Sequence, residues 1–134
     1  DLSGRMAEKR MVKLVGMAKE PFGLPELVGA TSGDLLVICF GSTYGAVREA
    51  VERAGSGKKR IGMLHFNRLW PFPAAEAKRV AARFKKIVAV ENNIQGQFDR
   101  LFRRETALPT GKPILRYDGR PFRVADLTAT LRRR

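Results

Sequence analysis

The sequence has very little cysteine or histidine: Cys39 and His65 are the only ones among its 134 residues. One cysteine cannot build a disulfide framework, and one cysteine with one histidine cannot make a zinc or iron–sulfur site. Because Cys39 lies inside an apolar run, we expect its thiol to be buried as a small hydrophobic group. The absence of a disulfide framework predicts a reducing, cytoplasmic setting.

Long apolar runs and acidic residues are also scarce. No run approaches the roughly 18 residues that a membrane-spanning helix needs, so we expect no membrane span and no membrane partner. Asp and Glu number 13 against 26 Lys and Arg, a formal net charge of +13. This excess favours an acidic partner, such as nucleic acid, an acidic protein or an anionic ligand, unless neighbouring subunits partly cover the basic surface.

Several catalytic motifs are missing as well. Residues 41–45 (Gly-Ser-Thr-Tyr-Gly) have neither the full GxGxxG spacing nor the lysine of a phosphate-binding loop, so they support nucleotide binding only weakly. Ser42 directly follows the glycine, which differs from the GxSxG pattern of a nucleophile elbow. We expect His65 to be a structural residue and Trp70 to pack against the end of the sheet. No catalytic residue and no metal ligand is assigned.

What the sequence does contain is one strong strand–turn–helix unit. Residues 35–40 form a continuous apolar run, which is typical of a strand covered on both faces in a parallel sheet. Gly41 allows a sharp turn, and Ser42 or Thr43 could cap the following helix by accepting a bond from a backbone N–H. Apolar residues then recur at helical spacing up to Gly55, where the helix is expected to stop.

Further strands and helices alternate along the chain. We expect strands at 26–29, 60–66, 87–90 and, more weakly, 113–117, with helices from Pro73, at 97–108 and after Gly119. This alternation predicts one α/β domain at residues 21–134, with three αβα layers and a mainly parallel sheet. The pattern of residues 1–20 predicts an amphipathic helix whose polar face is basic. We interpret this helix as a connector from a missing upstream domain.

Two polar loops follow the carboxyl ends of predicted strands and open helices. One contains Gly41, Ser42 and Thr43, and the other contains Asn92, Asn93, Gln95, Gly96 and Gln97. If the strands at 60–66 and 87–90 flank the strand at 35–40, these loops lie at a topological switch point, where open α/β sheets bind ligands. Two alternatives stay open: these residues are caps and turns, or they contact an anion or another subunit.

Four sets of residues together resemble one enzyme family. They are Phe40-Gly-Ser-Thr-Tyr-Gly45, Gly62-Met-Leu-His-Phe66 with Pro71-Phe-Pro73, Glu91-Asn-Asn with Gly96-Gln97, and Tyr117-Asp-Gly-Arg-Pro-Phe122. In this order they resemble the carboxyl-terminal portion of the α subunit of thiamine diphosphate-dependent 2-oxoacid:ferredoxin oxidoreductases. The 2-oxoglutarate type fits better than the pyruvate type, and the resemblance covers about residues 5–127.

The resemblance implies a fold like the carboxyl-terminal domain of transketolase, with five strands in the order 1-3-2-4-5 and the first strand antiparallel. It implies that the whole enzyme oxidatively decarboxylates a 2-oxoacid with coenzyme A as acceptor and ferredoxin as electron carrier. Thiamine diphosphate, Mg²⁺ and iron–sulfur clusters are the family's cofactors. The family's thiamine-contacting residues lie in the preceding domain and in the β subunit. We therefore expect this chain to bind no cofactor and to be inactive alone.

The role that the resemblance implies is assembly within an oligomer and shaping of the approach to the active site. Two other functions stay open. The charge of +13 suits a basic α/β module that binds nucleic acid, but the aromatic residues fall mostly in core stripes and no nucleic-acid motif is present, which weighs against that partner. A small-anion regulatory domain would use the crevice at the switch point.

Overall fold

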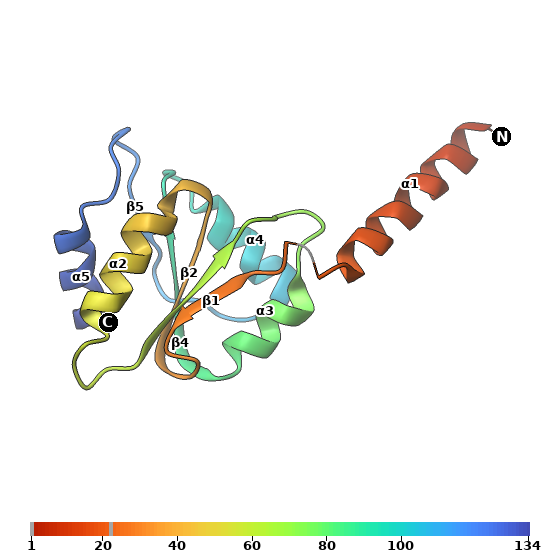
Figure 1. Ribbon diagram of the computed structural model, residues 1–134. Helices are drawn as coiled ribbons and strands as arrows, with labels where there is room; N and C mark the ends of the chain where they lie inside the picture. Colours follow the sequence, from red (N-terminus) through yellow and green to blue (C-terminus); the bar gives the residue numbers. More distant parts are fainter. Residues whose placement is uncertain (1, 22) are drawn as a thin grey trace.

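The computed structural model describes residues 2–21 and 23–134. Most of these residues form a three-layer α/β domain, in which one sheet lies between two layers of helices (Figure 1). Helix α1 (Leu2–Lys19) projects away from the three layers. The layered architecture predicted from the alternation of strands and helices is therefore confirmed.

The sheet has five strands: β1 (Glu26–Gly29), β2 (Gly33–Phe40), β3 (Ile61–Phe66), β4 (Phe84–Glu91) and β5 (Ile114–Leu115). Their order is β1-β3-β2-β4-β5, with β1 antiparallel to β3 and the other pairs parallel. This confirms the expected order and the antiparallel first strand. Because β2 is central and covered on both faces, its residues 35–39 are all buried, which explains the continuous apolar run.

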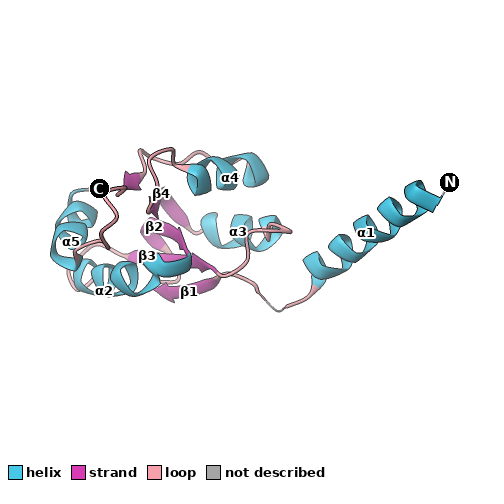
Figure 2. Ribbon diagram, turned by 90° about the horizontal axis from the view of Figure 1, so that it is seen from above, coloured by secondary structure: helices cyan, strands magenta, loops and turns pink. Residues whose placement is uncertain are grey.

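The helices other than α1 form two pairs, one on each face of the sheet (Figure 2). Helices α2 (Tyr44–Ala54) and α5 (Val124–Arg133) cover the face that carries Leu35, Val37 and Cys39. Helices α3 (Ala74–Ala81) and α4 (Gln97–Thr106) cover the face that carries Leu36 and Ile38. Successive side chains of a strand point to opposite faces, so one apolar run supplies both cores.

Several boundaries differ from those predicted. Strand β4 begins at Phe84 because backbone pairing with β2 carries it through Lys85 and Lys86, whose exposed side chains hide the strand in the sequence. Helix α4 ends at Thr106, earlier than expected, because the Thr106 hydroxyl donates to the Phe102 carbonyl and accepts from the Leu108 N–H. Strand β5 is only two residues long.

Helix α1 buries no residue, although it has the predicted apolar stripe. Its large exposed apolar side chains are Leu2, Met6, Met11, Val12, Val15 and Met17. Near its end, the Met17 carbonyl accepts a hydrogen bond of 3.0 Å from Nη1 of Arg68. An apolar helix face left uncovered suits a segment that packs against something else. The role of residues 1–20 as a connector stays a prediction.

Removing residues 1–19 is expected to change the free energy of unfolding of the remaining chain by less than about 1 kcal/mol, because α1 contributes no buried residue to either core. Urea denaturation of the full and shortened chains should give similar midpoints and similar denaturant slopes, since the slope follows the area exposed on unfolding. A loss of several kcal/mol would show that α1 packs on the domain.

Candidate functional site

The loops that the sequence analysis selected meet at the carboxyl edge of the sheet. Strand β2 lies between β3 on one side and β4 on the other, so the segments after β2 and β4 are neighbours at the switch point. The segments after β3 and β5 leave from the same edge because all four strands are parallel. We call this region the carboxyl edge.

The first loop turns through Gly41 (φ +58°) into a short 3₁₀ helix, η1 (Gly41–Thr43), before α2 begins. The prediction that Ser42 or Thr43 caps α2 is wrong, because neither side chain accepts a hydrogen bond at the helix start. Instead, the Thr43 hydroxyl donates to the Phe40 carbonyl at 2.8 Å. Thr43 is therefore buried and used within the loop, whereas Ser42 is exposed.

His65 supports this loop from the neighbouring strand. Its Nε2 donates to the Gly41 carbonyl at 3.1 Å, and its ring packs edge-on against Tyr44 with 4.8 Å between centroids. The ring is buried, and its Nδ1 has no hydrogen-bond partner among the described residues. These contacts fit the structural role expected for His65.

The second loop is organised by Glu91, which the sequence analysis included in a family motif but did not select as a site residue. Its side chain is fully buried, and its carboxylate accepts from the backbone N–H groups of Phe98 at 2.9 Å and Asp99 at 3.0 Å. The side-chain amide of Asn93 donates to the same carboxylate. Glu91 therefore caps α4 from the preceding strand, while the residue at the cap position, Gly96, supplies only a left-handed turn (φ +62°).

Most of the remaining polar residues of the second loop form hydrogen bonds within the loop. Oδ1 of Asn93 accepts from the backbone N–H groups of Gln95 at 3.1 Å and Gln97 at 3.2 Å. The Gln97 amide donates to the Gln95 side-chain oxygen at 3.2 Å. Asn92, in contrast, is exposed and makes no such contact with any residue that the structure describes. Of the selected polar side chains, only Ser42 and Asn92 therefore remain free for a ligand.

Ser42 and Asn92 meet at one cavity of about 470 Å³ on the carboxyl edge. We call it the arginine pocket, and its lining residues are Ser42, Asn92, Arg116, Tyr117, Gly119, Arg120 and Pro121. Sequence reasoning did not place 116–121 at this site. The available signal was the Asp118-Gly119 turn between two arginines, just after the edge strand that pairs with β4.

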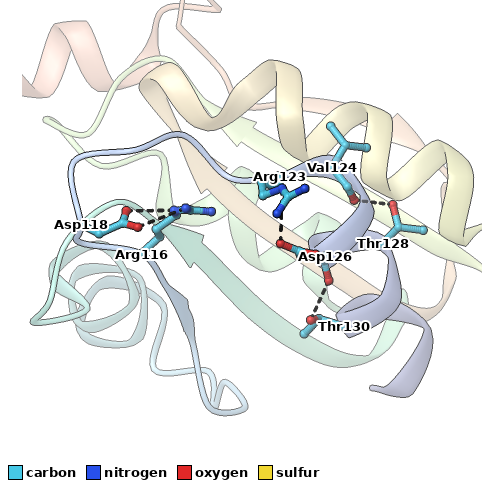
Figure 3. A network of polar contacts seen from close by, with 7 residues as sticks. All are labelled: Arg116, Asp118, Arg123, Val124, Asp126, Thr128 and Thr130. Atoms are coloured by element: carbon cyan, nitrogen blue, oxygen red, sulfur yellow. Dashed lines mark hydrogen bonds and ion pairs between the residues drawn. The ribbon is translucent and has the colours of Figure 1, made fainter.

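The charges around the arginine pocket are partly paired. Nε and Nη2 of Arg116 donate to the two carboxylate oxygens of Asp118 at 2.9 and 3.1 Å (Figure 3). The Arg120 backbone N–H donates to the same carboxylate at 3.1 Å. The Arg116 hydrogen bond, followed by that from Arg120, lowers the pKa of Asp118 below its usual value. The Arg120 guanidinium has no ion-pair partner among the described residues, so the pocket keeps one uncompensated positive charge.

Exposed apolar side chains gather at the same edge. Beyond α1, the large ones among the described residues are Leu24 before β1 and then Trp70, Ile94 and Tyr117 in the loops after β3, β4 and β5. The start of β1 also lies at this edge, because Glu26 pairs with His65 near the end of β3. The expectation that Trp70 packs against the sheet is wrong, since its side chain is 60% exposed.

Burial raises the pKa of the Cys39 thiol to about 12, although a hydrogen bond with the Thr43 side chain acts in the opposite direction. Because the thiolate is the reactive form, a thiol reagent at pH 8 should label the folded chain at least about 100-fold more slowly than the chain in denaturant. Spectrophotometric thiol titration measures both rates. Rapid labelling of the folded chain would contradict the burial of this side chain.

Two further findings concern residues 2–21 and 23–134. No three His, Cys, Asp or Glu side chains among them come together in a group that could hold a metal ion. In the same part of the chain, no helix combines the length and the apolar character that crossing a membrane requires.

Known proteins are similar to this chain in fold and in sequence. Residues 33–127 match the family model described as pyruvate:ferredoxin oxidoreductase core domain II. The chain is similar to a solved structure of the 2-oxoglutarate:ferredoxin oxidoreductase from Magnetococcus marinus with 2-oxoglutarate, coenzyme A and succinyl-CoA bound. The TM-score is 0.85 and the identity 29%, and the match covers 98% of this chain and 23% of that chain.

Two curated relatives are similar to the chain in sequence. The chain is 36% identical over 96 residues to the 2-oxoglutarate oxidoreductase subunit KorA of Mycobacterium tuberculosis, covering 69% of this chain and 14% of that protein. It is 30% identical over 131 residues to the alpha subunit of 2-oxoacid:ferredoxin oxidoreductase 1 of Sulfurisphaera tokodaii, covering 94% of this chain and 20% of that protein. The chain thus spans about a fifth or less of the length of these relatives. With most of its residues matched by the family model, the chain belongs to the family of the pyruvate:ferredoxin oxidoreductase core domain II.

Proposed function

We propose that this chain acts as a non-catalytic domain of the α subunit of a 2-oxoacid:ferredoxin oxidoreductase. The observation that carries the proposal is the match of nearly the whole chain to a 2-oxoglutarate:ferredoxin oxidoreductase, of which the chain spans only 23%. The reaction of the whole enzyme is the oxidative decarboxylation of a 2-oxoacid, with 2-oxoglutarate favoured as the substrate. Coenzyme A is the acceptor, ferredoxin takes the electrons, and the setting is cytoplasmic.

The residues of this chain do not fit the cofactors of that reaction. Its single cysteine, Cys39, is buried in β2 and cannot hold an iron–sulfur cluster by itself. The buried carboxylate at the carboxyl edge, Glu91, is occupied by three donors and is not free to bind Mg²⁺ near a diphosphate. Thiamine diphosphate, Mg²⁺ and the clusters are therefore assigned to other parts of the complex, and no catalytic step is assigned here.

The role proposed for this domain is assembly. Its exposed large apolar side chains lie on α1 and at the carboxyl edge, where the chain also presents free polar groups. Apolar groups concentrated in this way mark an interaction surface. Since the chain spans about a fifth of its relatives, we take the occupant of this surface to be the thiamine-binding part of the same α subunit. The β subunit then joins the oligomer through that assembly.

The test uses a complete α subunit that contains this chain, produced together with a β subunit. Replacing Trp70 and Ile94 by Asp should reduce assembly and 2-oxoglutarate-dependent reduction of ferredoxin together, because charges would enter an apolar interface. Ala82→Asp places the same charge at the opposite end of the sheet, on an exposed residue before β4, and should change neither. Size-exclusion chromatography measures assembly, and a spectroscopic assay measures turnover.

Two results would count against the proposal. If the 134-residue chain alone turned over a 2-oxoacid, the domain would not be non-catalytic. If the Trp70→Asp and Ile94→Asp variants assembled as well as Ala82→Asp, the carboxyl edge would not be the interface.

A further inference from the structure

We infer that the arginine pocket binds a small phosphate-bearing anion. The inference rests on the chemistry of the pocket and is tested on the chain by itself; in a complete α subunit it requires that the pocket stays open beside the interface of the proposed function. The pocket has a volume of about 470 Å³, which exceeds that of one phosphate and leaves room for an organic group attached to it. It lies at the switch point of the sheet, where ligands of open α/β folds bind.

Four hydrogen-bond donors that line the pocket have no partner among the described residues, whereas neighbouring polar side chains are hydrogen-bonded within their loops. The side chains of Ser42, Asn92, Tyr117 and the guanidinium of Arg120 make no hydrogen bond or ion pair with any described residue. These four donors come from three loops that are distant in sequence but converge on one cavity. Their neighbours Thr43, Asn93 and Gln97, by contrast, are bonded within their own loops.

The charge of the pocket favours a phosphate. Arg116 is held in place by both oxygens of Asp118, and that contact raises the pKa of Arg116 and lowers that of Asp118. Both groups therefore stay ionised near neutral pH and cancel, which leaves the Arg120 charge for the ligand. A guanidinium offers planar pairs of N–H donors that match phosphate oxygens. The exposed ring of Tyr117 supplies a flat apolar wall for the organic part of a phosphate monoester.

The test titrates the 134-residue chain with inorganic phosphate, phenyl phosphate and acetate and follows backbone amide signals by NMR. Phosphate and phenyl phosphate should saturate with dissociation constants of about 1 mM or below, with phenyl phosphate the tighter. The shifted signals should be those of Ser42, Asn92 and Gly119. Arg120→Gln should weaken binding by about tenfold, because one charge-assisted contact is lost.

Matched controls keep the test decisive. Arg10→Gln removes the same charge from α1, which projects away from the domain, and should leave both dissociation constants unchanged (Figure 1). Unchanged spectra of the free variants would show that the fold is intact. Binding that is not saturable, or that falls equally in Arg120→Gln and Arg10→Gln, would mean that the net charge of the chain attracts the anion. That result would overturn the inference. Acetate binding at the same residues with equal affinity would also overturn it, because the pocket would then take carboxylates.

Discussion

Replacing Phe66 by Ala is expected to lower the free energy of unfolding by about 3–5 kcal/mol. Phe66 lies in β3 with its side chain almost fully buried between the sheet and the layer of α3 and α4. Its ring stacks on Phe72 at 5.3 Å and meets Phe98 edge-on at 5.2 Å and Phe102 edge-on at 6.3 Å. Alanine would leave a cavity that three segments share, since these rings come from β3, α4 and the segment before α3.

Urea denaturation of the wild-type chain and the variant measures this loss, provided that the denaturant slope is unchanged. Tyr117→Ala is the matched control, because Tyr117 is 65% exposed and its removal should change the free energy of unfolding by no more than about 0.5 kcal/mol. A loss at Phe66 below about 1.5 kcal/mol would mean that the surrounding rings collapse into the space and that the cluster is not tightly packed.

Much of this core could be predicted from the sequence, because its signals are local. The apolar run of β2 and the helical spacing in α2 need no distant partner to be recognised. The start of β4 could not be predicted, since Lys85 and Lys86 are polar and only pairing with β2 makes them part of a strand. The exposure of α1 could not be predicted either. Its stripe satisfies the pattern of a packed helix, but whether a surface faces that stripe is a property of the whole assembly.

The candidate site also shows what could not be predicted from the sequence. Ser42 and Asn92 were identified because they follow strands at a switch point, a rule that depends only on topology. Arg116 and Arg120 were missed because they join the site only when β5 pairs with β4, a contact between segments far apart in the sequence. Asn93 and Gln97 were selected with two roles left open, turn residues or ligand contacts, and the structure shows both bonded within the loop. Residue type alone does not distinguish a bonded amide from a free one.

Glu91→Ala is expected to be as damaging as the loss of a core aromatic, at about 3–5 kcal/mol of the free energy of unfolding. Among the described residues, the Glu91 carboxylate is the only hydrogen-bond acceptor of the buried backbone N–H groups of Phe98 and Asp99. Each such group costs about 1–3 kcal/mol when it is left buried and unpaired, and the missing side chain adds a cavity. The first turn of α4 should therefore fray.

Two variants separate the loss of the carboxylate from the loss of volume. Glu91→Gln keeps the shape but points an amide NH₂ at one of the backbone N–H groups, so about 1–2 kcal/mol should be lost. Glu49→Ala removes an exposed carboxylate of α2 that pairs with Arg53 on the surface, and the loss should stay within about 0.5 kcal/mol. Denaturation in urea ranks the three variants, and hydrogen exchange reports on the first turn of α4.

The same substitution tests how the carboxyl edge is held in place. Because the Glu91 carboxylate also binds the Asn93 amide, its removal should loosen the whole second loop and shift Asn92 at the arginine pocket. Faster amide exchange is then expected at Gln95 and Gln97 as well as at Phe98. If Glu91→Ala unfolds no more easily than Glu49→Ala and the amides of α4 stay protected, water must replace the carboxylate as the acceptor. In that case Glu91 would not be the group that positions the loop, and Gly96 and the Asn93 turn alone would hold the entry into α4.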